Sequence, residues 1–122
     1  MHGLHLIADL RHCPAGQAAL VDTAALRQLC LAAVQVVGLH PVGELFHRFP
    51  APGGVTGVVL LAESHVAVHT WPELGAVTLD VYVCNLGEDN SARAEALLAA
   101  LEQAFAAGHC ERHRVLRGSL QT

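Results

Sequence analysis

Three consecutive runs of sequence decide the fold: VTGVVLLA (55–62), ESHVAVHT (63–70) and, after WPELGA (71–76), VTLDVYVC (77–84). The first run is β-branched and apolar, which is typical of a buried central strand. The third run alternates strictly, with Val or Leu at every odd position and less apolar residues between them. We therefore expect neighbouring strands over 55–62, 66–70 and 77–84, with a turn at 72–75.

The flanking sequence adds two helices and three further strands to this sheet. One helix should begin at Asp22 or Thr23 and end at Gly38, because apolar residues between them recur at helical spacing. A second should begin at Asn90 or Ser91 and close at Gly108. The further strands are expected at 3–10, 42–49 and 112–116. The order β-α-β-β-β-β-α-β predicts an α+β fold, a two-layer sandwich of a mostly antiparallel sheet with both helices on one face.

The chain has 122 residues, which predicts a single domain spanning 1–122. Hydrophobic residues make up 52% of the chain and charged residues only 15%. This is a high apolar share for a small domain, whose surface is large for its volume. We therefore expect one apolar face to be buried against a second copy of the chain, giving a homodimer.

The net charge, the search for signal and membrane segments, and the cysteine spacing restrict the partners and the compartment that we expect. The formal net charge is −4 and no basic cluster occurs, so no nucleic acid is expected as a partner. No signal-peptide pattern is present, and the longest apolar run is too short to span a membrane. The four cysteines are scattered without a C-x-x-C pair. These features predict a cytoplasmic protein with free thiols that does not contact membranes.

All seven basic residues are arginine, so the chain contains no lysine. A pyridoxal-phosphate enzyme and a lysine-type aldolase both need a lysine to form their Schiff base. Both classes are therefore excluded. If this protein performs imine chemistry, the carbonyl must be on the protein and the amine on the substrate.

Polar residues interrupt the most sheet-like region at Glu63-Ser64-His65 and His69-Thr70. These could be ordinary hydrogen-bonded residues of a sheet. They could instead be metal ligands, with His65, His69 and Cys84 as one set or Cys110 with His113 as a weaker pair. The remaining interpretation is nucleophilic chemistry by Ser64, with His69 and Cys84 as proton carriers.

The string ESHVAVHTWPE (63–73), followed by LDVYVC (79–84), closely resembles the prokaryotic S-adenosylmethionine decarboxylase family. The runs FHRF (46–49), GVTGVVLLA (54–62) and GLHLIADL (3–10) are similar to that family as well. The resemblance extends over nearly the whole chain and favours the nucleophilic interpretation, with no metal.

The resemblance implies that the chain is a proenzyme which cuts itself between Glu63 and Ser64. Ser64 would attack the Glu63 carbonyl to form an ester, and elimination and hydrolysis would then leave a pyruvoyl group in place of Ser64. The products would be a β chain of residues 1–63 and an α chain of residues 64–122. In this family pattern His69 is the acid or base of processing, and Thr56 supports it.

The resemblance also implies what the pyruvoyl group does. It condenses with the substrate amine and accepts electrons as carbon dioxide leaves, so neither pyridoxal phosphate nor a metal is needed. Cys84 is the implied proton donor, and a thiol suits this role because it gives up its proton readily near neutral pH. Members of the family are dimers with sites near the subunit interface.

The implied substrate is S-adenosylmethionine, whose decarboxylated form supplies aminopropyl groups for spermidine and other polyamines. Phe49 matches an aromatic residue that stacks on adenine, and Glu73 matches an acid that holds the ribose hydroxyls. Phe49 could alternatively be an ordinary core residue.

Two alternatives stay open from the sequence. The same chemistry could act on L-ornithine or L-arginine, with Glu73, Glu44 or Asp80 binding the distal cation. The chain could also be a non-catalytic regulatory homologue, although it keeps Ser64, His69 and Cys84 together.

Overall fold

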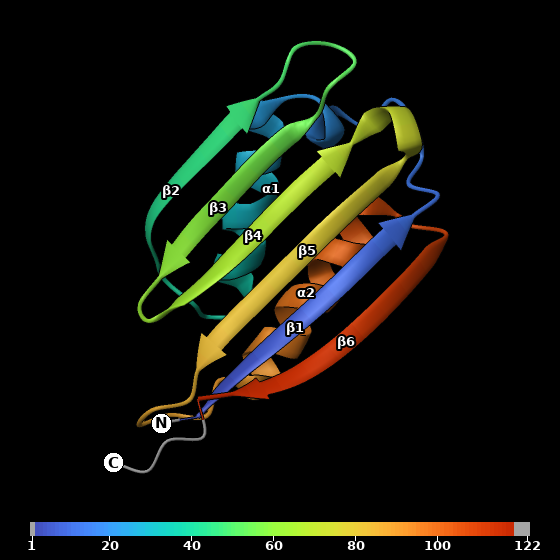
Figure 1. Cartoon of the computed structure of the whole chain (residues 1–122). Helices are drawn as coiled ribbons and strands as arrows, with labels where there is room; N and C mark the ends of the chain where they lie inside the picture. The colour runs from blue at the N-terminus through green and yellow to red at the C-terminus, as the bar shows by residue number, and fades with distance from the viewer. Residues whose placement is uncertain (1, 119–122) are drawn as a thin grey trace.

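The computed structural model describes residues 2–118, which form one six-stranded sheet with two helices on one of its faces (Figure 1). The strand order is β2-β3-β4-β5-β1-β6, and every neighbouring pair is antiparallel. The elements are β1 (Gly3–Arg11), α1 (Thr23–Val36), β2 (Pro41–Arg48), β3 (Val55–Leu61), β4 (Ser64–Trp71), β5 (Ala76–Cys84), α2 (Ser91–Phe105) and β6 (His109–Arg117). Single-turn 3₁₀ helices lie at Ala18–Leu20 and Pro72–Leu74.

The predicted α+β class, the order of the elements and the antiparallel sheet are confirmed. Several boundaries shift by a residue or two, and three of the differences have a visible cause. The strand expected at 66–70 already begins at Ser64, because a two-residue turn brings Ser64 opposite Leu61. Helix α2 ends at Phe105 and is closed by Ala106 in the left-handed region (φ 52°) rather than by Gly108. The last strand begins at His109 because β1 pairs with it along its whole length.

The core lies between the sheet and the two helices. In α1 the buried residues Leu26, Cys30 and Val34 recur every four positions, so they form one stripe facing the sheet. The helix begins where predicted, since the Asp22 carboxylate accepts a hydrogen bond from the Ala24 N–H at 3.0 Å. In α2 the corresponding buried stripe consists of Ala94, Leu97, Leu98, Leu101 and Phe105.

Strand alternation places two different sets of side chains on the two faces of the sheet. Along β4, Val66, Val68 and Thr70 are buried toward the helices. His65, Ala67, His69 and Trp71 therefore lie on the opposite face, which no helix covers (Figure 1). The sequence signal of four-residue spacing between His65 and His69 thus correctly predicts that they share a face.

Thr70 is the single buried polar side chain of the core among the described residues. Its hydroxyl donates to the Leu20 carbonyl at 2.8 Å and accepts from the Val55 N–H at 2.8 Å. It therefore joins the segment before α1 to the start of β3.

Replacing Thr70 with valine should lower the free energy of unfolding by about 2 kcal/mol, because two buried backbone groups lose their partner. Urea unfolding followed by circular dichroism measures this change. Thr70→Ser keeps the hydroxyl and should lose markedly less. Equal losses in both variants would show that the methyl group, not the hydroxyl, stabilises this position.

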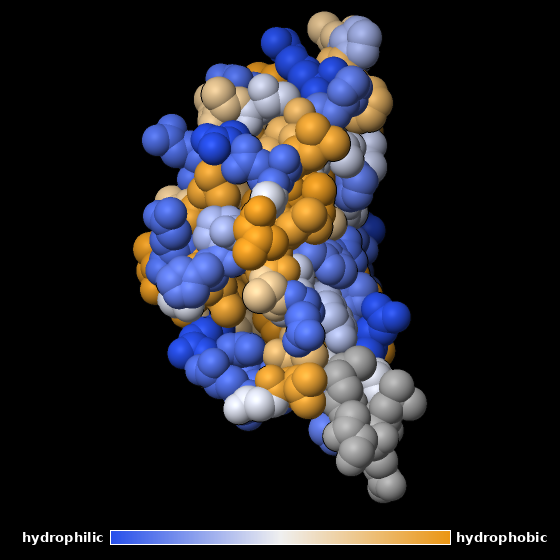
Figure 2. Space-filling view, turned by 90° about the vertical axis from the view of Figure 1, so that its left-hand side faces the viewer, coloured by the Kyte–Doolittle hydropathy of each residue, from blue (hydrophilic) through white to orange (hydrophobic). Residues whose placement is uncertain are grey.

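The helix-free face leaves several large apolar side chains in contact with solvent. Trp71 is 38% exposed, Leu60 49% and Leu45 72%. Figure 2 looks onto the β2 edge of the sheet, beside this face, and shows apolar residues gathered between hydrophilic ones along that edge. The helix-free face is therefore apolar in several places where solvent reaches it.

Candidate functional site

The bond between Glu63 and Ser64 lies in the tight turn that joins β3 to β4. Leu61 pairs with Ser64, so Ala62 and Glu63 alone make the turn. Glu63 has φ 56°, in the left-handed region that costs a residue with a side chain of order 1 kcal/mol. The turn therefore holds the predicted cleavage bond in a strained, partly exposed conformation.

The Ser64 hydroxyl is held at the end of β5. Its Oγ accepts a hydrogen bond from the Cys84 N–H at 3.1 Å. Cys84 is the last residue of β5 and is 9% exposed. The structure thus brings together Ser64 and Cys84, two of the three residues expected to carry the chemistry.

A second group of predicted residues lies at the other end of the same strands. Thr56 and His69 are direct partners in the β3–β4 ladder, and Thr56 Oγ1 lies 3.1 Å from His69 Nδ1. The His69 ring also stacks on Trp71, with centroids 5.9 Å apart. Thr56 and Trp71 therefore fix the orientation of His69 from two sides.

A cavity of about 330 Å³ opens beside His69. Phe49 and Glu73, the predicted substrate-binding residues, both line it together with His69. Phe49 is 47% exposed, so the alternative that it belongs to the core is wrong. The full lining is Phe49, Gly53, Gly54, Thr56, His69, Thr70, Trp71 and Glu73.

The structure does not bring Ser64 and His69 together within one chain. They are the first and sixth residues of β4. Five residues of extended strand span about 17 Å, which is far beyond the reach of a proton transfer. One chain therefore presents Ser64 with Cys84 at one end of the sheet, and Thr56, His69, Phe49 and Glu73 at the other.

Sequence reasoning missed three residues at these two ends. Trp71 lines the cavity and stacks on His69. It is the only tryptophan of the chain and lies within the 63–73 motif, a signal that could have identified it. Asn90 and Arg93 lie beside Ser64 in a hollow of about 310 Å³ at the other end. Nothing in their local sequence distinguished them from ordinary residues at the start of a helix.

Of the three carboxylates proposed for binding a distal cation, only Glu73 lines the cavity. Glu44 pairs with Arg27, and Asp80 lies 3.1 Å from His5 Nε2. Both are therefore engaged by neighbouring side chains of their own chain.

Within residues 2–118, no three His, Cys, Asp or Glu side chains gather closely enough to hold a metal ion. The proposed set of His65, His69 and Cys84 is among those that do not converge. In the same part of the chain, no helix is long and apolar enough to cross a membrane.

A histidine cluster lies on the helix-free face next to the Ser64 and Cys84 end. The His65 ring stacks on Tyr82 with centroids 5.7 Å apart, and His5 is 6.4 Å from His65. Burial lowers the pKa of His65, and His5 and Arg117 lower it further, against an opposing effect of Asp80. Protonating His65 is therefore disfavoured in the folded chain.

This lowered pKa makes folding stability depend on pH. Below about pH 6.5 the unfolded chain protonates His65 more readily than the folded chain does, so acid favours unfolding. Above that pH both states hold a neutral ring and the effect disappears. We expect the free energy of unfolding to fall less between about pH 7.5 and about pH 5.5 in His65→Gln than in the parent chain. Urea titrations at both pH values measure this, and equal losses in the two proteins would contradict it.

Comparison with known proteins gives consistent matches. A family model described as S-adenosylmethionine decarboxylase matches residues 4–118. The chain is 35% identical over 118 residues to the S-adenosylmethionine decarboxylase proenzyme of Acidithiobacillus ferrooxidans, covering 97% of this chain and 84% of that protein. It is 40% identical over 100 residues to the proenzyme of Persephonella marina, covering 82% and 73%.

The proenzyme of Aquifex aeolicus is 45% identical over 82 residues, a match that covers 67% of this chain and 58% of that protein. The fold is also similar to a crystal structure of the adenosylmethionine decarboxylase from the same organism. The TM-score is 0.86 at 31% identity, and the superposition covers 98% of this chain and 92% of the other.

Proposed function

Since the chain belongs to the S-adenosylmethionine decarboxylase family, we propose that it is a self-cleaving, pyruvoyl-dependent carboxy-lyase acting on S-adenosyl-L-methionine. Its decarboxylated product is an aminopropyl donor of the kind that spermidine synthesis consumes. The β chain comprises residues 1–63 and the α chain residues 64–122.

One observation carries this proposal: Ser64 follows a strained turn, and its hydroxyl is held in place by Cys84. Glu63, which is exposed and in the left-handed region, supplies the carbonyl directly before the nucleophile. Attack by Ser64 Oγ replaces the peptide bond by an ester, and breaking the turn releases the strain at Glu63.

These residues fit a pyruvoyl group formed from Ser64. The chain has no lysine that could hold another carbonyl cofactor, and the only amine the reaction needs arrives with the substrate. The group supplies an electron sink for the electrons left behind when carbon dioxide departs. Cys84, whose backbone N–H contacts the Ser64 hydroxyl, would return a proton to the substrate from its thiol.

A second copy of the chain completes the site. We place the two sheets face to face, related by a two-fold axis that is perpendicular to the strands. The strands of one copy then run in the opposite direction to those of the other. The Ser64 and Cys84 end of one copy then lies over the His69 and Thr56 end of the other. The exposed apolar residues of the helix-free face, among them Leu60 and Trp71, would be buried in this contact. We therefore propose a homodimer in which each site takes residues from both subunits.

The cavity beside His69 suits an adenosyl sulfonium compound. Its volume of about 330 Å³ lies within the range of small-molecule sites. Phe49 and Trp71 present aromatic faces that can stack on adenine and attract a sulfonium cation, and Glu73 can accept hydrogen bonds from ribose hydroxyls.

Two measurements test the proposal. The intact mass of the purified protein should show two fragments cut between Glu63 and Ser64 instead of one 12.9 kDa chain. Carbon dioxide release should then be seen with S-adenosylmethionine and not with L-ornithine or L-arginine. Release from ornithine or arginine alone would overturn the substrate, and a chain that stays whole on long incubation would overturn the mechanism.

A further inference from the structure

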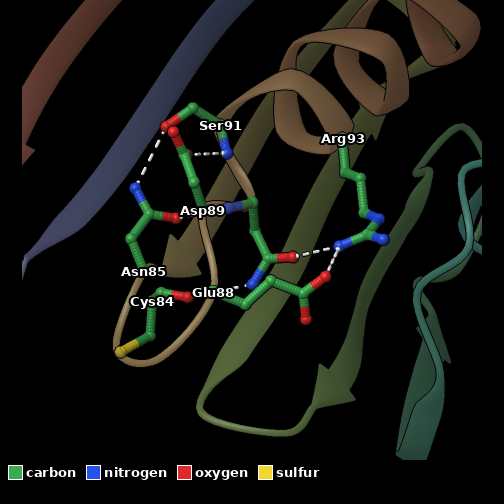
Figure 3. A network of polar contacts seen from close by, with 7 residues as sticks. Cys84, Asn85, Glu88, Asp89, Ser91 and Arg93 are labelled. Carbon is green, nitrogen blue, oxygen red and sulfur yellow. Dashed lines mark hydrogen bonds and ion pairs between the residues drawn. The ribbon is translucent and has the colours of Figure 1, made fainter.

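We propose that Asn90, held by Arg93, is a positioning residue that sets the backbone of Cys84 and thereby the N–H group that contacts the Ser64 hydroxyl. This inference rests on the proposed self-cleavage at Ser64. Figure 3 shows the polar contacts around the loop between β5 and α2, on which the proposal rests.

Cys84 lies just beyond the last residue pair of the β4–β5 ladder, which is His65 with Tyr82. In an antiparallel strand the N–H and C=O of a residue point to the same side. On the β4 side, the ladder therefore offers Cys84 no backbone partner. Two side chains take over: the N–H donates to Ser64 Oγ at 3.1 Å, and the C=O accepts from Asn90 Nδ2 at 3.1 Å.

Asn90 stands at the N-cap of α2, yet its side chain does not cap the helix. The Asp89 carboxylate accepts from the Ser91 N–H at 2.9 Å instead, and Asn85 Oδ1 accepts from the Asn90 N–H at 2.8 Å. The usual task of an N-cap asparagine is thus performed by its neighbours. The Asn90 amide is left to bridge Cys84 and Arg93.

Arg93 determines which way the Asn90 amide points. A guanidinium group only donates, so the atom 2.7 Å from Arg93 Nη1 must be the amide oxygen. The amide nitrogen then faces the Cys84 carbonyl, which only accepts. Both contacts are satisfied by one orientation, and a flipped amide would lose both.

The position of Cys84 matters for the first step of cleavage. As Ser64 Oγ bonds to the Glu63 carbonyl carbon, the peptide C–N bond breaks and the hydroxyl proton passes to the released amine. The Cys84 N–H holds Oγ in place as it approaches the Glu63 carbonyl carbon. Asn90 restrains the Cys84 carbonyl, and this restraint keeps the Cys84 N–H directed at Ser64 Oγ.

Asn90→Asp is the sharpest test, because it is nearly isosteric. The aspartate keeps an oxygen for Arg93 but sets a second oxygen against the Cys84 carbonyl in place of the donor. We expect the rate of self-cleavage to fall about tenfold or more. The hydrogen bond to the Cys84 carbonyl is lost, and the new carboxylate oxygen repels that carbonyl. The matched control Asp89→Asn makes the reverse exchange in the same loop and should cleave within about twofold of the parent rate.

Two further readouts separate positioning from folding. In the cleaved fraction of Asn90→Asp, kcat should fall while KM stays near the parent value, because none of the residues that line the substrate cavity belongs to this loop. The urea midpoint should match that of Asp89→Asn. Arg93→Met should slow cleavage in the same direction, because it frees the Asn90 amide to flip.

Parent-like cleavage and kcat in Asn90→Asp would overturn this role for Asn90. So would an equal slowing in Asp89→Asn, or a loss of cleavage that only follows a loss of stability. These outcomes leave self-cleavage intact. A parent chain that never cleaves would instead overturn the proposed function itself.

Discussion

Replacing Ser64 with alanine is expected to leave the protein as one uncut 12.9 kDa chain with no decarboxylase activity above background. The alanine has no oxygen to attack the Glu63 carbonyl, so neither the ester nor the pyruvoyl group can form. The chain also has no lysine to provide another route to imine chemistry. Loss of both cleavage and activity should therefore be complete rather than partial.

Intact-mass spectrometry and carbon dioxide release from S-adenosylmethionine measure the two effects. Thr23→Ala, which removes a hydroxyl at the start of α1 far along the chain from the turn, is the control and should cleave normally. Ser64→Ala should fold as the parent does, because the Cys84 N–H it frees is at a strand end where water can replace the lost contact. Cleavage that persists in Ser64→Ala would overturn the mechanism.

Co-expressing Ser64→Ala with His69→Ala is expected to restore activity that neither variant has alone. If each site takes Ser64 from one subunit and His69 from the other, a mixed dimer contains one complete site. It pairs the Ser64 of the His69→Ala chain with the His69 of the Ser64→Ala chain. Random assembly makes half of the dimers mixed, so about a quarter of the parent number of sites should process and turn over.

The separation of the two residues along β4 is the reason for this expectation. Five residues of strand place them about 17 Å apart in one chain, and no side chain bridges that length. A tagged copy of each variant allows mixed dimers to be isolated and their cleavage followed by mass. Ser64→Ala co-expressed with Cys84→Ala is the matched control and should stay inactive, because both residues lie at the same end. Mixed dimers of Ser64→Ala and His69→Ala that stay inert would show that the sites are not shared.

These two results also decide whether the chain is an enzyme or a non-catalytic homologue. A regulatory subunit would remain uncut as the parent chain and would gain nothing from mixing variants. The strained Glu63 turn and the contact between Cys84 and Ser64 favour an enzyme over a non-catalytic homologue. Both features serve self-cleavage, which a non-catalytic chain would not perform.

Much of the fold was determined by the sequence alone. Alternation over 77–84 and helical spacing between Asp22 and Gly38 are local patterns, and local patterns suffice to predict elements and their order. The boundaries at Ser64 and Ala106 differed because strand pairing and a non-glycine left-handed residue closed those elements. Neither cause is visible in a short window of sequence.

The sequence also identified Ser64, His69, Cys84, Phe49 and Glu73 as the candidate site, through a long motif and the absence of lysine. Only the tertiary structure decided how these residues are distributed. The rise of β4 carries Ser64 and His69 to opposite ends of the sheet, and the end of the β4–β5 ladder leaves Cys84 to be held by Asn90. Both facts depend on strand register and on contacts between distant segments, which a motif does not contain.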